Sequence, residues 1–456
     1  LGEGKISKDW KLANVSAIFK KGSRGDPGNY RPVTLTSNIG KTLERILKDE
    51  IVQFLERNNL IRNSQHGFRN KRSCLTNLLE FMELVEEQLD KGEMVDVIYL
   101  DFQKAFDKVS HDKLLSKLKA IGIEGKLFNW IKEWLTERKQ RVVINGEESE
   151  WADVLSGVPQ GSILGPSLFI IYINDIEEGV RNKILKFADD TKLIGAVGSD
   201  QKVKELREDL ARLFGWSQTW QMQFNIEKCH VMHLGFKNKG EKYSINGKEL
   251  GITNEERDLG VQISSDFKVA KQCGKAAKKA NKILGLIKRN IRCKTKNIIV
   301  RLYKALVRPH MEYCVQAWRP HLAKDINILE RVQRRATKMI EECRGQSYEE
   351  RLKFTGLITL EQRRTRADML EVYKILKGFE GLEANRFFTM QNMNLRGHSL
   401  RLHKEGFRKD IVKYSFRNRV INTWNELPDK AVNSGTINSF KGHLDRYLSL
   451  KGGRES

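Results

Sequence analysis

Three aspartates, far apart in the chain, have the residue type and the surroundings of a metal-binding phosphoryl-transfer site. Asp189 and Asp190 are adjacent and lie between two short apolar runs, which predicts a β-hairpin with carboxylates at its tight turn. Neighbouring carboxylates repel each other, so a fold keeps them at low solvent exposure only when a cation offsets their charge. Magnesium is a hard cation that binds carboxylates together with substrate phosphates. Taken alone, the Asp-Asp pair also fits a solvated loop.

Asp101 supplies the third carboxylate. It ends an apolar run that begins at Val95, and this run predicts a largely buried strand. A carboxylate at the end of such a strand is costly unless it is paired or metal-bound. Together with Asp189 and Asp190 it would form a site for two ions about 4 Å apart, which clamp the attacking and leaving oxygens of an in-line displacement.

A loop rich in glycine and proline, residues 156–169, separates the two acidic segments. Its composition predicts a rigid loop that another backbone or a ligand can approach closely, followed by an apolar helix from Leu168 to Ile173. The simpler interpretation is a strand–helix connection. The more specific one is a loop that places its backbone and Gln160 against a nucleotide.

These segments, in this order, resemble motifs A, B and C of reverse transcriptases. The matching segments are Leu100-Asp101-x4-Phe106-Asp107, Gly157-Val158-Pro159-Gln160-Gly161 and Phe187-Ala188-Asp189-Asp190. Further segments resemble the fingers motifs, motif D and the primer-grip motif E of non-LTR (LINE-type) retrotransposon enzymes: Asn29-Tyr30-Arg31-Pro32-Val33-Thr34-Leu35, Gln65-His66-Gly67-Phe68-Arg69, Asn225-Ile226-Glu227-Lys228 and Asp258-Leu259-Gly260-Val261. The resemblance covers nearly the whole chain, and segments such as Trp424-Asn425-Glu426-Leu427-Pro428 are similar to the jockey and chicken-repeat branch. The chain departs from many relatives in having Phe187 in place of tyrosine.

The resemblance implies an RNA-directed DNA polymerase that adds dNTPs to a primer 3′-hydroxyl on an RNA template. Two Mg²⁺ ions, with Mn²⁺ as a substitute, would activate the hydroxyl and hold the triphosphate. The metal-site residues it implies are Asp101, Phe102, Asp189 and Asp190, with Asp190 as the weaker ligand. Lys228 would protonate the leaving pyrophosphate, and Phe106 would be a steric gate against the ribose 2′-hydroxyl. Asp107 is expected to have a structural part.

The remaining site residues follow from the same resemblance. Gln160 and Gly161 would contact the incoming nucleotide. Four fingers cations are candidates to hold the triphosphate, with Lys41 and Arg69 slightly favoured: Arg31, Lys41, Arg45 and Arg69.

The charge of the chain also favours a polyanionic partner. The formal net charge is +24 over 456 residues, and 39% apolar residues suffice for hydrophobic cores. From Phe267 to Met311 there is no Asp or Glu, but there are many Lys and Arg among apolar residues at helical spacing. This is typical of a helix that packs on one face and meets phosphates on the other, although it also fits a solvated face. The candidate nucleic-acid contacts are Gly260, Lys275, Lys278, Lys279 and Lys282, and they would grip an A-like RNA–DNA hybrid through its backbone.

The expected fold is α+β, a right-hand polymerase with fingers, a palm of antiparallel sheet plus helices, a helical thumb and a mainly helical basic C-terminal region. The expected boundaries are 1–95, 96–265, 266–345 and 346–456. Helices are predicted at Ile39–Asn58, Cys74–Asp90, Lys113–Ala120 and Lys202–Gln218. The segment Glu330-Arg331-Val332-Gln333-Arg334-Arg335 is typical of an exposed helix face.

The cysteines and the lack of long apolar runs further limit the kinds of protein that the sequence fits. The six cysteines contain no C-x-x-C pair, and in an intracellular protein they are expected to be reduced. Zinc at Cys229 with His233 or at His310 with Cys314 is disfavoured, because neither has a second close ligand pair. No membrane span is predicted, and the expected location is intracellular, as a ribonucleoprotein in cytoplasm and nucleus. The chain resembles a fragment of a longer polyprotein, and no endonuclease domain is evident in it. Two alternatives stay open: a decayed or domesticated copy that only binds nucleic acid, and an RNA-copying viral polymerase, which Phe106 opposes.

Overall fold

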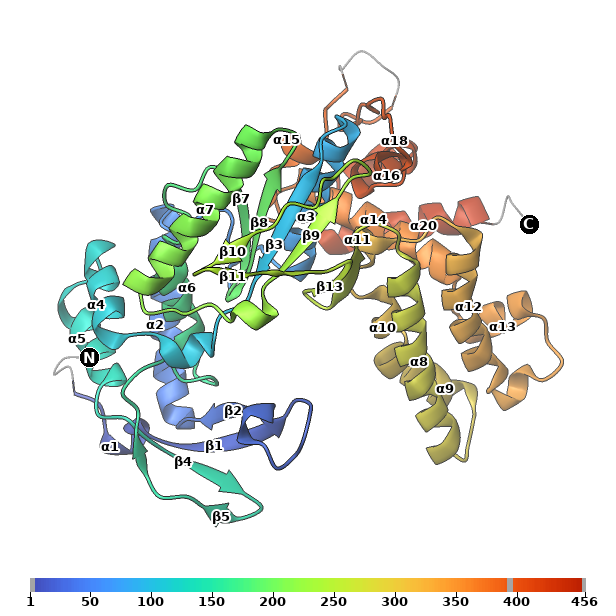
Figure 1. Cartoon of the computed structure of the whole chain (residues 1–456). Helices are drawn as coiled ribbons and strands as arrows, with labels where there is room; N and C mark the ends of the chain where they lie inside the picture. The colour runs from blue at the N-terminus through green and yellow to red at the C-terminus, as the bar shows by residue number, and fades with distance from the viewer. Residues whose placement is uncertain (1–4, 392–396, 453–456) are drawn as a thin grey trace.

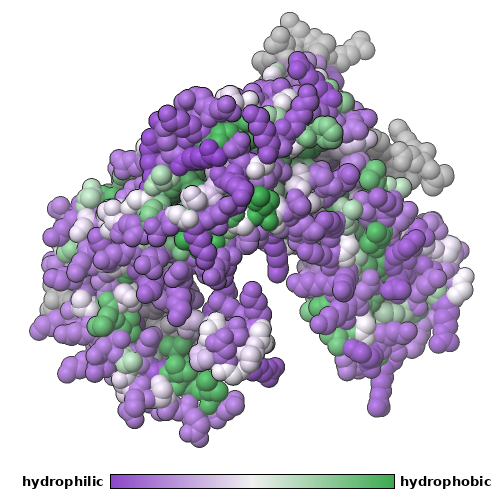
Figure 2. Space-filling model, viewed as in Figure 1, coloured by the Kyte–Doolittle hydropathy of each residue, from purple (hydrophilic) through white to green (hydrophobic). Residues whose placement is uncertain are grey.

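The computed structural model describes residues 5–391 and 397–452. Two lobes lie on either side of an open gap, and a central sheet with its helices joins them above (Figure 1). One lobe carries the strands β1, β2 and β4, and the other is built of the helices α8 to α13. The gap is equally plain when side chains fill the view (Figure 2).

The central sheet has the strand order β12-β9-β3-β8-β7. Its strands are β3 (Val95–Leu100), β7 (Lys183–Phe187), β8 (Asp190–Ala196), β9 (His230–Leu234) and β12 (Gly251–Ile252). All six residues of β3 are buried because strands flank it on both sides and helices cover the sheet. The predicted antiparallel palm sheet is confirmed for β9, β3, β8 and β7, whereas the edge strand β12 runs parallel to β9.

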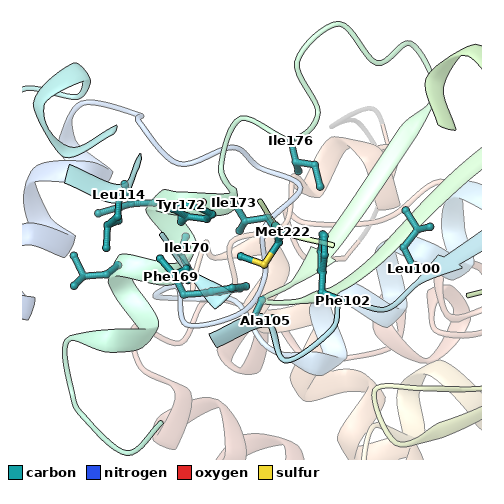
Figure 3. Packing of buried hydrophobic residues seen from close by; sticks show 14 of the residues in the cluster. Leu100, Phe102, Ala105, Leu114, Phe169, Ile170, Tyr172, Ile173, Ile176 and Met222 are labelled. Carbon is teal, nitrogen blue, oxygen red and sulfur yellow. The ribbon is translucent and has the colours of Figure 1, made fainter. Parts of the chain in front are cut away.

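The predicted apolar helix after the Gly/Pro loop is α6 (Gly165–Ile173), which begins three residues earlier than expected. It is apolar all round and buried along most of its length, as expected for a helix enclosed by other elements. Figure 3 shows its side chains Phe169, Ile170, Tyr172 and Ile173 packed near Phe102 and Ala105, which lie just after strand β3. This core holds the end of β3 in place.

Most of the other predicted elements are also confirmed. The helices are α2 (Asn38–Arg57), α3 (Cys74–Asp90), α4 (His111–Ala120) and α7 (Asp200–Thr219), each within two residues of its expected bounds. The Asp-Asp hairpin is formed by β7 and β8, with Phe187 paired to Asp190 across the turn. The strand predicted to end at Asp101 ends one residue earlier, at Leu100.

A second sheet forms the N-terminal lobe, in the order β2-β1-β4-β5 with β6 on β4. Its strands are β1 (Leu12–Phe19), β2 (Tyr30–Leu35), β4 (Lys139–Ile144), β5 (Glu147–Glu148) and β6 (Ala152–Asp153). β4 runs parallel to β1. Residues 139–153, which the expected boundaries place in the palm, thus belong to the N-terminal sheet. The helices α1 (Lys8–Lys11) and α5 (Gly125–Leu135) are joined by an ion pair between Lys11 and Glu133 at 2.7 Å.

The second lobe follows two small hairpins: β10 (Ser244–Ile245) with β11 (Lys248–Glu249), and β13 (Glu255–Asp258) with β14 (Val261–Ser264). Its helices are α8 (Ala270–Asn290), α9 (Lys296–Leu302), α10 (Pro309–Glu312), α11 (Val315–Trp318), α12 (Ala323–Lys338) and α13 (Tyr348–Thr355). Their apolar faces form one core with α3 and the sheet. That core holds the lobe against the palm.

The C-terminal region is mainly helical, as predicted. Its elements are α14 (Leu360–Leu376), α15 (Ala384–Phe387), α16 (Asp410–Lys413), α17 (Phe416–Arg419), α18 (Ile421–Asn425), α19 (Asp429–Val432) and α20 (Ile437–Gly452). They enclose a third core and dock on α3, where Arg386 forms ion pairs with Glu80 and Glu83 at 2.6 and 3.1 Å. No described helix is both long enough and apolar enough to cross a lipid bilayer.

Candidate active site

Asp101, Asp189 and Asp190 line one cleft of about 1670 Å³ between the β1–β2 hairpin and the central sheet. The antiparallel register explains why they meet: Leu100, the last residue of β3, pairs with Thr191 of β8. The residue after β3 and the turn before β8 are therefore at the same end of the sheet. The sheet brings together carboxylates that are distant in sequence.

The hairpin turn that carries Asp189 is held from behind by a residue that the motif analysis did not assign a role. Gln65 Oε1 accepts hydrogen bonds from Ala188 N at 2.9 Å and from Gly67 N at 2.8 Å. Ala188 has a left-handed φ of 55°, and a Cβ on Gly67 would lie 2.5 Å from Ala188 N. A non-glycine residue in that conformation is strained, so the Gln65 contacts help to fix the turn.

The two carboxylates of the hairpin have raised pKa values, as expected for buried acids close to one another. Burial raises the pKa of Asp189, and the Asp101 carboxylate adds to this, while Arg31 and Lys20 act in the opposite direction. Burial and repulsion by Asp189, Asp258 and Asp101 raise the pKa of Asp190 to about 6. A bound cation would relieve this repulsion.

Asp101 is tied to the motif D segment. Lys228 Nζ lies 2.8 Å from Asp101 Oδ2. The Asp101 backbone carbonyl accepts a hydrogen bond from Asn225 N at 2.7 Å, and the Asp101 amide donates to Cys229 Sγ at 3.5 Å. Cys229 is thus a buried neighbour of Asp101.

The described residues contain no group of three or more His, Cys, Asp and Glu side chains arranged to hold a metal ion. The three aspartates share the cleft, but Asp101 is paired with Lys228. Of the residues weighed for zinc, His233 uses its Nδ1 to pair with Asp96 Oδ1 at 2.8 Å. The side chain of Phe102 is buried and stacks on Phe224 with ring centroids 4.6 Å apart, so only its backbone oxygen could bind a cation.

Phe106 and Gln160 also line the cleft. The Phe106 ring stacks on Phe169 of α6 with centroids 4.5 Å apart. Gln160 Nε2 donates to Asp107 Oδ1 at 3.2 Å, which gives Asp107 a positioning contact with the motif B loop. Burial raises the pKa of Asp107, and the hydrogen bond from Gln160 opposes the shift.

Gly161 is required by the packing of this loop against β2. Its φ is +130°, and a Cβ there would lie 2.3 Å from the Thr34 carbonyl oxygen. Thr34 N donates to the Gln160 carbonyl at 2.7 Å, so the loop and the fingers strand are joined directly. Any larger residue at 161 would separate them.

The fingers cations divide into two groups. Arg31 lines the cleft, whereas Lys41, Arg45 and Arg69 are not among the described residues that line it. Arg69 instead donates to both carboxylate oxygens of Glu56 at 2.9 and 2.7 Å, as a bidentate ion pair inside the fingers.

Two cations that were not among the sequence candidates also line the cleft. Lys20 and Arg24, in the loop between β1 and β2, line the cleft with Arg31. The signal was present in Lys20-Lys21-Gly22-Ser23-Arg24-Gly25, a run of cations separated by residues that favour turns, just before the Arg31 motif.

The candidate thumb contacts lie on α8 and on the β13–β14 hairpin. Lys275, Lys278, Lys279 and Lys282 are exposed, while the apolar side of α8 packs in the core. Gly260 has a φ of +89° in the hairpin turn, and Tyr313 Oη donates to the neighbouring Leu259 carbonyl at 2.9 Å. This contact joins the hairpin to the helical lobe.

The chain matches the family "Reverse transcriptase (RNA-dependent DNA polymerase)" over residues 18–288. It is 28% identical over 357 residues to the RNA-directed DNA polymerase from mobile element jockey of Drosophila melanogaster, covering 72% of this chain and 38% of that protein. The jockey protein of Drosophila funebris is 29% identical over 342 residues, covering 70% of this chain and 37% of that protein. The probable RNA-directed DNA polymerase from transposon X-element of Drosophila melanogaster is 25% identical over 346 residues, covering 73% and 38%.

The chain thus spans less than two fifths of the length of these relatives. Among solved structures, apo telomerase from Candida tropicalis has a TM-score of 0.46 and 11% identity, covering 76% of this chain and 60% of that one. The family match covers the whole central sheet, all three aspartates and most of α8, and it begins near the end of β1 in the N-terminal sheet. The chain therefore belongs to the reverse transcriptase (RNA-dependent DNA polymerase) family, in the jockey branch of LINE-type retrotransposon enzymes.

Proposed function

We propose that the protein is the RNA-directed DNA polymerase of a non-LTR retrotransposon, and that it adds dNTPs to a primer 3′-hydroxyl on an RNA template. The observation that carries this proposal is the meeting of Asp101, Asp189 and Asp190 in one cleft with Phe106 and Gln160. These residues come from three motifs of the family that are separated along the chain, and the fold brings them together.

The donor set fits magnesium. Carboxylate oxygens are the ligands that this ion prefers, and the burial and mutual repulsion that raise the pKa of Asp189 and of Asp190 support a bound cation there. Asp101 and Asp189 would hold two ions, with Asp190 beside them and Mn²⁺ as a substitute. When bound, the ions neutralise the triphosphate and lower the pKa of the primer hydroxyl.

The other residues bind and orient the nucleotide. Lys20, Arg24 and Arg31 bring positive charge to the side of the cleft opposite the sheet, where a triphosphate needs it. Gln160, held by Asp107, contacts the nucleotide, and the Phe106 ring occupies the space that a ribose 2′-hydroxyl would need. Once the Lys228 ammonium has separated from Asp101, it supplies a proton to the departing pyrophosphate.

The exposed lysines of α8 grip the product duplex. Lys278 and Lys282 are one helical turn apart on the solvent side of the helix, in the lobe across the gap from the fingers (Figure 1). An RNA–DNA hybrid is A-like, so these contacts recognise its backbone and shape, not its sequence. The proposed partners are an RNA template, a DNA primer and dNTPs, in an intracellular ribonucleoprotein of cytoplasm and nucleus.

Primer extension on an RNA template with dNTPs and Mg²⁺ tests the proposal. The wild-type chain should extend the primer, and Asp189→Asn should slow extension by about 10³-fold, because a lost metal ligand removes several kcal/mol of charge stabilisation. Asp112→Asn, which removes the same charge from an exposed position in the first turn of α4, serves as the control. Equal extension by Asp189→Asn and the wild type would refute the metal assignment.

A further inference from the structure

A cationic groove lies between α8, α12 and α13, on the side of α8 that is turned away from the fingers (Figure 1). It encloses about 610 Å³. Its lining includes Arg331, Arg334, Arg335 and Lys338 of α12. No Asp or Glu is among the described residues that line it.

The spacing of the four cations places them in one stripe. Arg331, Arg334, Arg335 and Lys338 are at positions i, i+3, i+4 and i+7, and all are exposed. At about 1.5 Å per residue the stripe extends about 10 Å along the helix axis. Within the described chain none of the four forms an ion pair with a carboxylate, although Arg335 Nη1 donates to Asn281 of α8 at 3.2 Å.

The acidic residue next to the stripe is turned inward and does not neutralise it. Glu330 is buried, and its carboxylate accepts hydrogen bonds from Tyr348 Oη, from Gln333 Nε2 at 3.3 Å and from Leu360 N at 3.0 Å. The segment 330–335 is therefore not the uniformly exposed helix face that its sequence predicts. The Glu330 carboxylate is hydrogen-bonded inside the core, whereas the arginines face the groove.

The wall opposite α12 is preorganised. Arg351 of α13 is buried and fixed by Thr337 Oγ1 at 3.1 Å and by the Gln346 carbonyl at 2.7 Å. The Arg334 guanidinium lies over the Tyr348 ring, 4.3 Å from its centroid. Arginines held in this way lose little conformational freedom on binding a phosphate.

The geometry points to a second nucleic-acid site: the α12 stripe binds the phosphodiester backbone of a strand that lies outside the active-site cleft. The stripe length matches about three phosphates of one strand. The site is distinct from the α8 lysines, because α12 flanks α8 on one side and α10, nearer the cleft, flanks it on the other (Figure 1). It would retain template RNA while a short duplex occupies the cleft.

The test uses the full chain and a fluorescein-labelled single-stranded RNA of about 30 nucleotides, titrated by anisotropy over about 50 to 300 mM KCl. The groove variant is Arg331→Gln/Arg335→Gln/Lys338→Gln. The matched control is Lys126→Gln/Lys204→Gln/Lys237→Gln, which removes the same charge from exposed positions on other elements. Circular dichroism verifies that both triple variants are folded.

We expect the groove variant to lower the slope of log K against log salt by about 2, since each phosphate contact on a single strand contributes about 0.7. Its RNA affinity near 0.1 M salt should fall about tenfold or more, whereas the control should stay within about twofold of the wild type. Primer extension on a duplex short enough to lie within the cleft should be unchanged in both. The groove proposal rests on the proposed function only for its role, because the anisotropy titration measures RNA binding even if the wild-type chain does not extend primers. Failure of the groove and failure of the polymerase proposal are thus distinguishable.

Three results would overturn the proposal. The first is an RNA affinity and salt slope of the groove variant equal to those of the control. The second is a fall in short-duplex extension in proportion to the loss of RNA binding, which would place the stripe in the cleft machinery. The third is loss of binding to an acidic polyglutamate peptide with RNA binding intact. A parallel titration with DNA of the same sequence shows whether either strand type or RNA alone occupies the groove.

Discussion

The Lys228 ammonium and the Asp101 carboxylate form an ion pair, with Nζ and Oδ2 2.8 Å apart. Lys228 is the expected proton donor to pyrophosphate, and Asp101 is an expected metal ligand. It is open to solvent, with 59% of the Lys228 side chain and 31% of the Asp101 side chain exposed, so its strength is modest. A cation that binds Asp101 must compete with Lys228, which can then turn to the nucleotide.

Lys228→Met should therefore separate metal binding from catalysis. Without the competing ammonium, affinity for Mn²⁺ or Mg²⁺ should rise by up to about fivefold, which corresponds to an exposed pair of up to about 1 kcal/mol. Extension should nevertheless slow, because the proton donor is gone. Calorimetric titration of the metal and single-turnover extension measure the two effects. Weaker metal binding in the variant would contradict the competition.

Phe106→Ala should relax selection of the sugar. The ring is held by its stack on Phe169, so the wild-type wall is firm, and its removal should raise incorporation of rNTPs relative to dNTPs by about tenfold or more. The ratio of kcat/KM for matched dNTP and rNTP gives the answer. Phe106→Tyr keeps the ring and should keep the selectivity. If the alanine variant discriminates as well as the wild type, Phe106 is only a core residue.

Gly260→Ala should loosen the joint between the β13–β14 hairpin and the helical lobe. The new Cβ would meet Tyr313 Cε1 at 3.3 Å with φ at +89°, so we expect a loss of about 1–2 kcal/mol in unfolding free energy. Gly274→Ala is the control, because Gly274 lies inside α8 with nothing within 4 Å of its would-be Cβ. That change should be neutral or stabilising by up to about 1 kcal/mol. Denaturant unfolding of both variants checks the difference.

The stability of the protein should depend on pH through Glu86 of α3. Burial raises its pKa to about 8 from an ordinary 4.5, and Arg417 and Arg419 offset only part of the shift. The folded state therefore favours the protonated carboxyl, so this group's contribution is full below about pH 4.5 and is lost as the pH rises through 8.

Glu86→Gln should accordingly stabilise the protein increasingly between those two pH values, by up to about 4 kcal/mol. Its neighbour Glu87 pairs with Lys91 and has 38% of its side chain exposed, so Glu87→Gln should shift stability little at any pH. Urea unfolding at several pH values measures both. A flat difference between Glu86→Gln and the wild type would show that Glu86 ionises normally.

The local pattern of the sequence determined most of the elements. The apolar run of β3, the Asp-Asp hairpin and the helix α3 were predictable because alternation, helical periodicity and turn residues act over a few neighbouring positions. The motif order also indicated which acids should meet. What the spacing could not show is that Gln65 holds the turn beneath Asp189, since that contact joins segments more than one hundred residues apart.

Tertiary structure alone decided how charges are used. Arg69 and Arg31 look alike in sequence, yet Glu56 binds the first inside the fingers while the second reaches the cleft. Residues 139–143 of β4 pair with β1, more than one hundred residues earlier in the chain. In α12, the carboxylate of Glu330 turned into the core and left the adjacent arginines without a counter-charge. A charged side chain can bind a ligand only if the fold does not place an opposite charge within hydrogen-bonding distance of it. That partner usually lies far away along the chain, so the sequence does not reveal it.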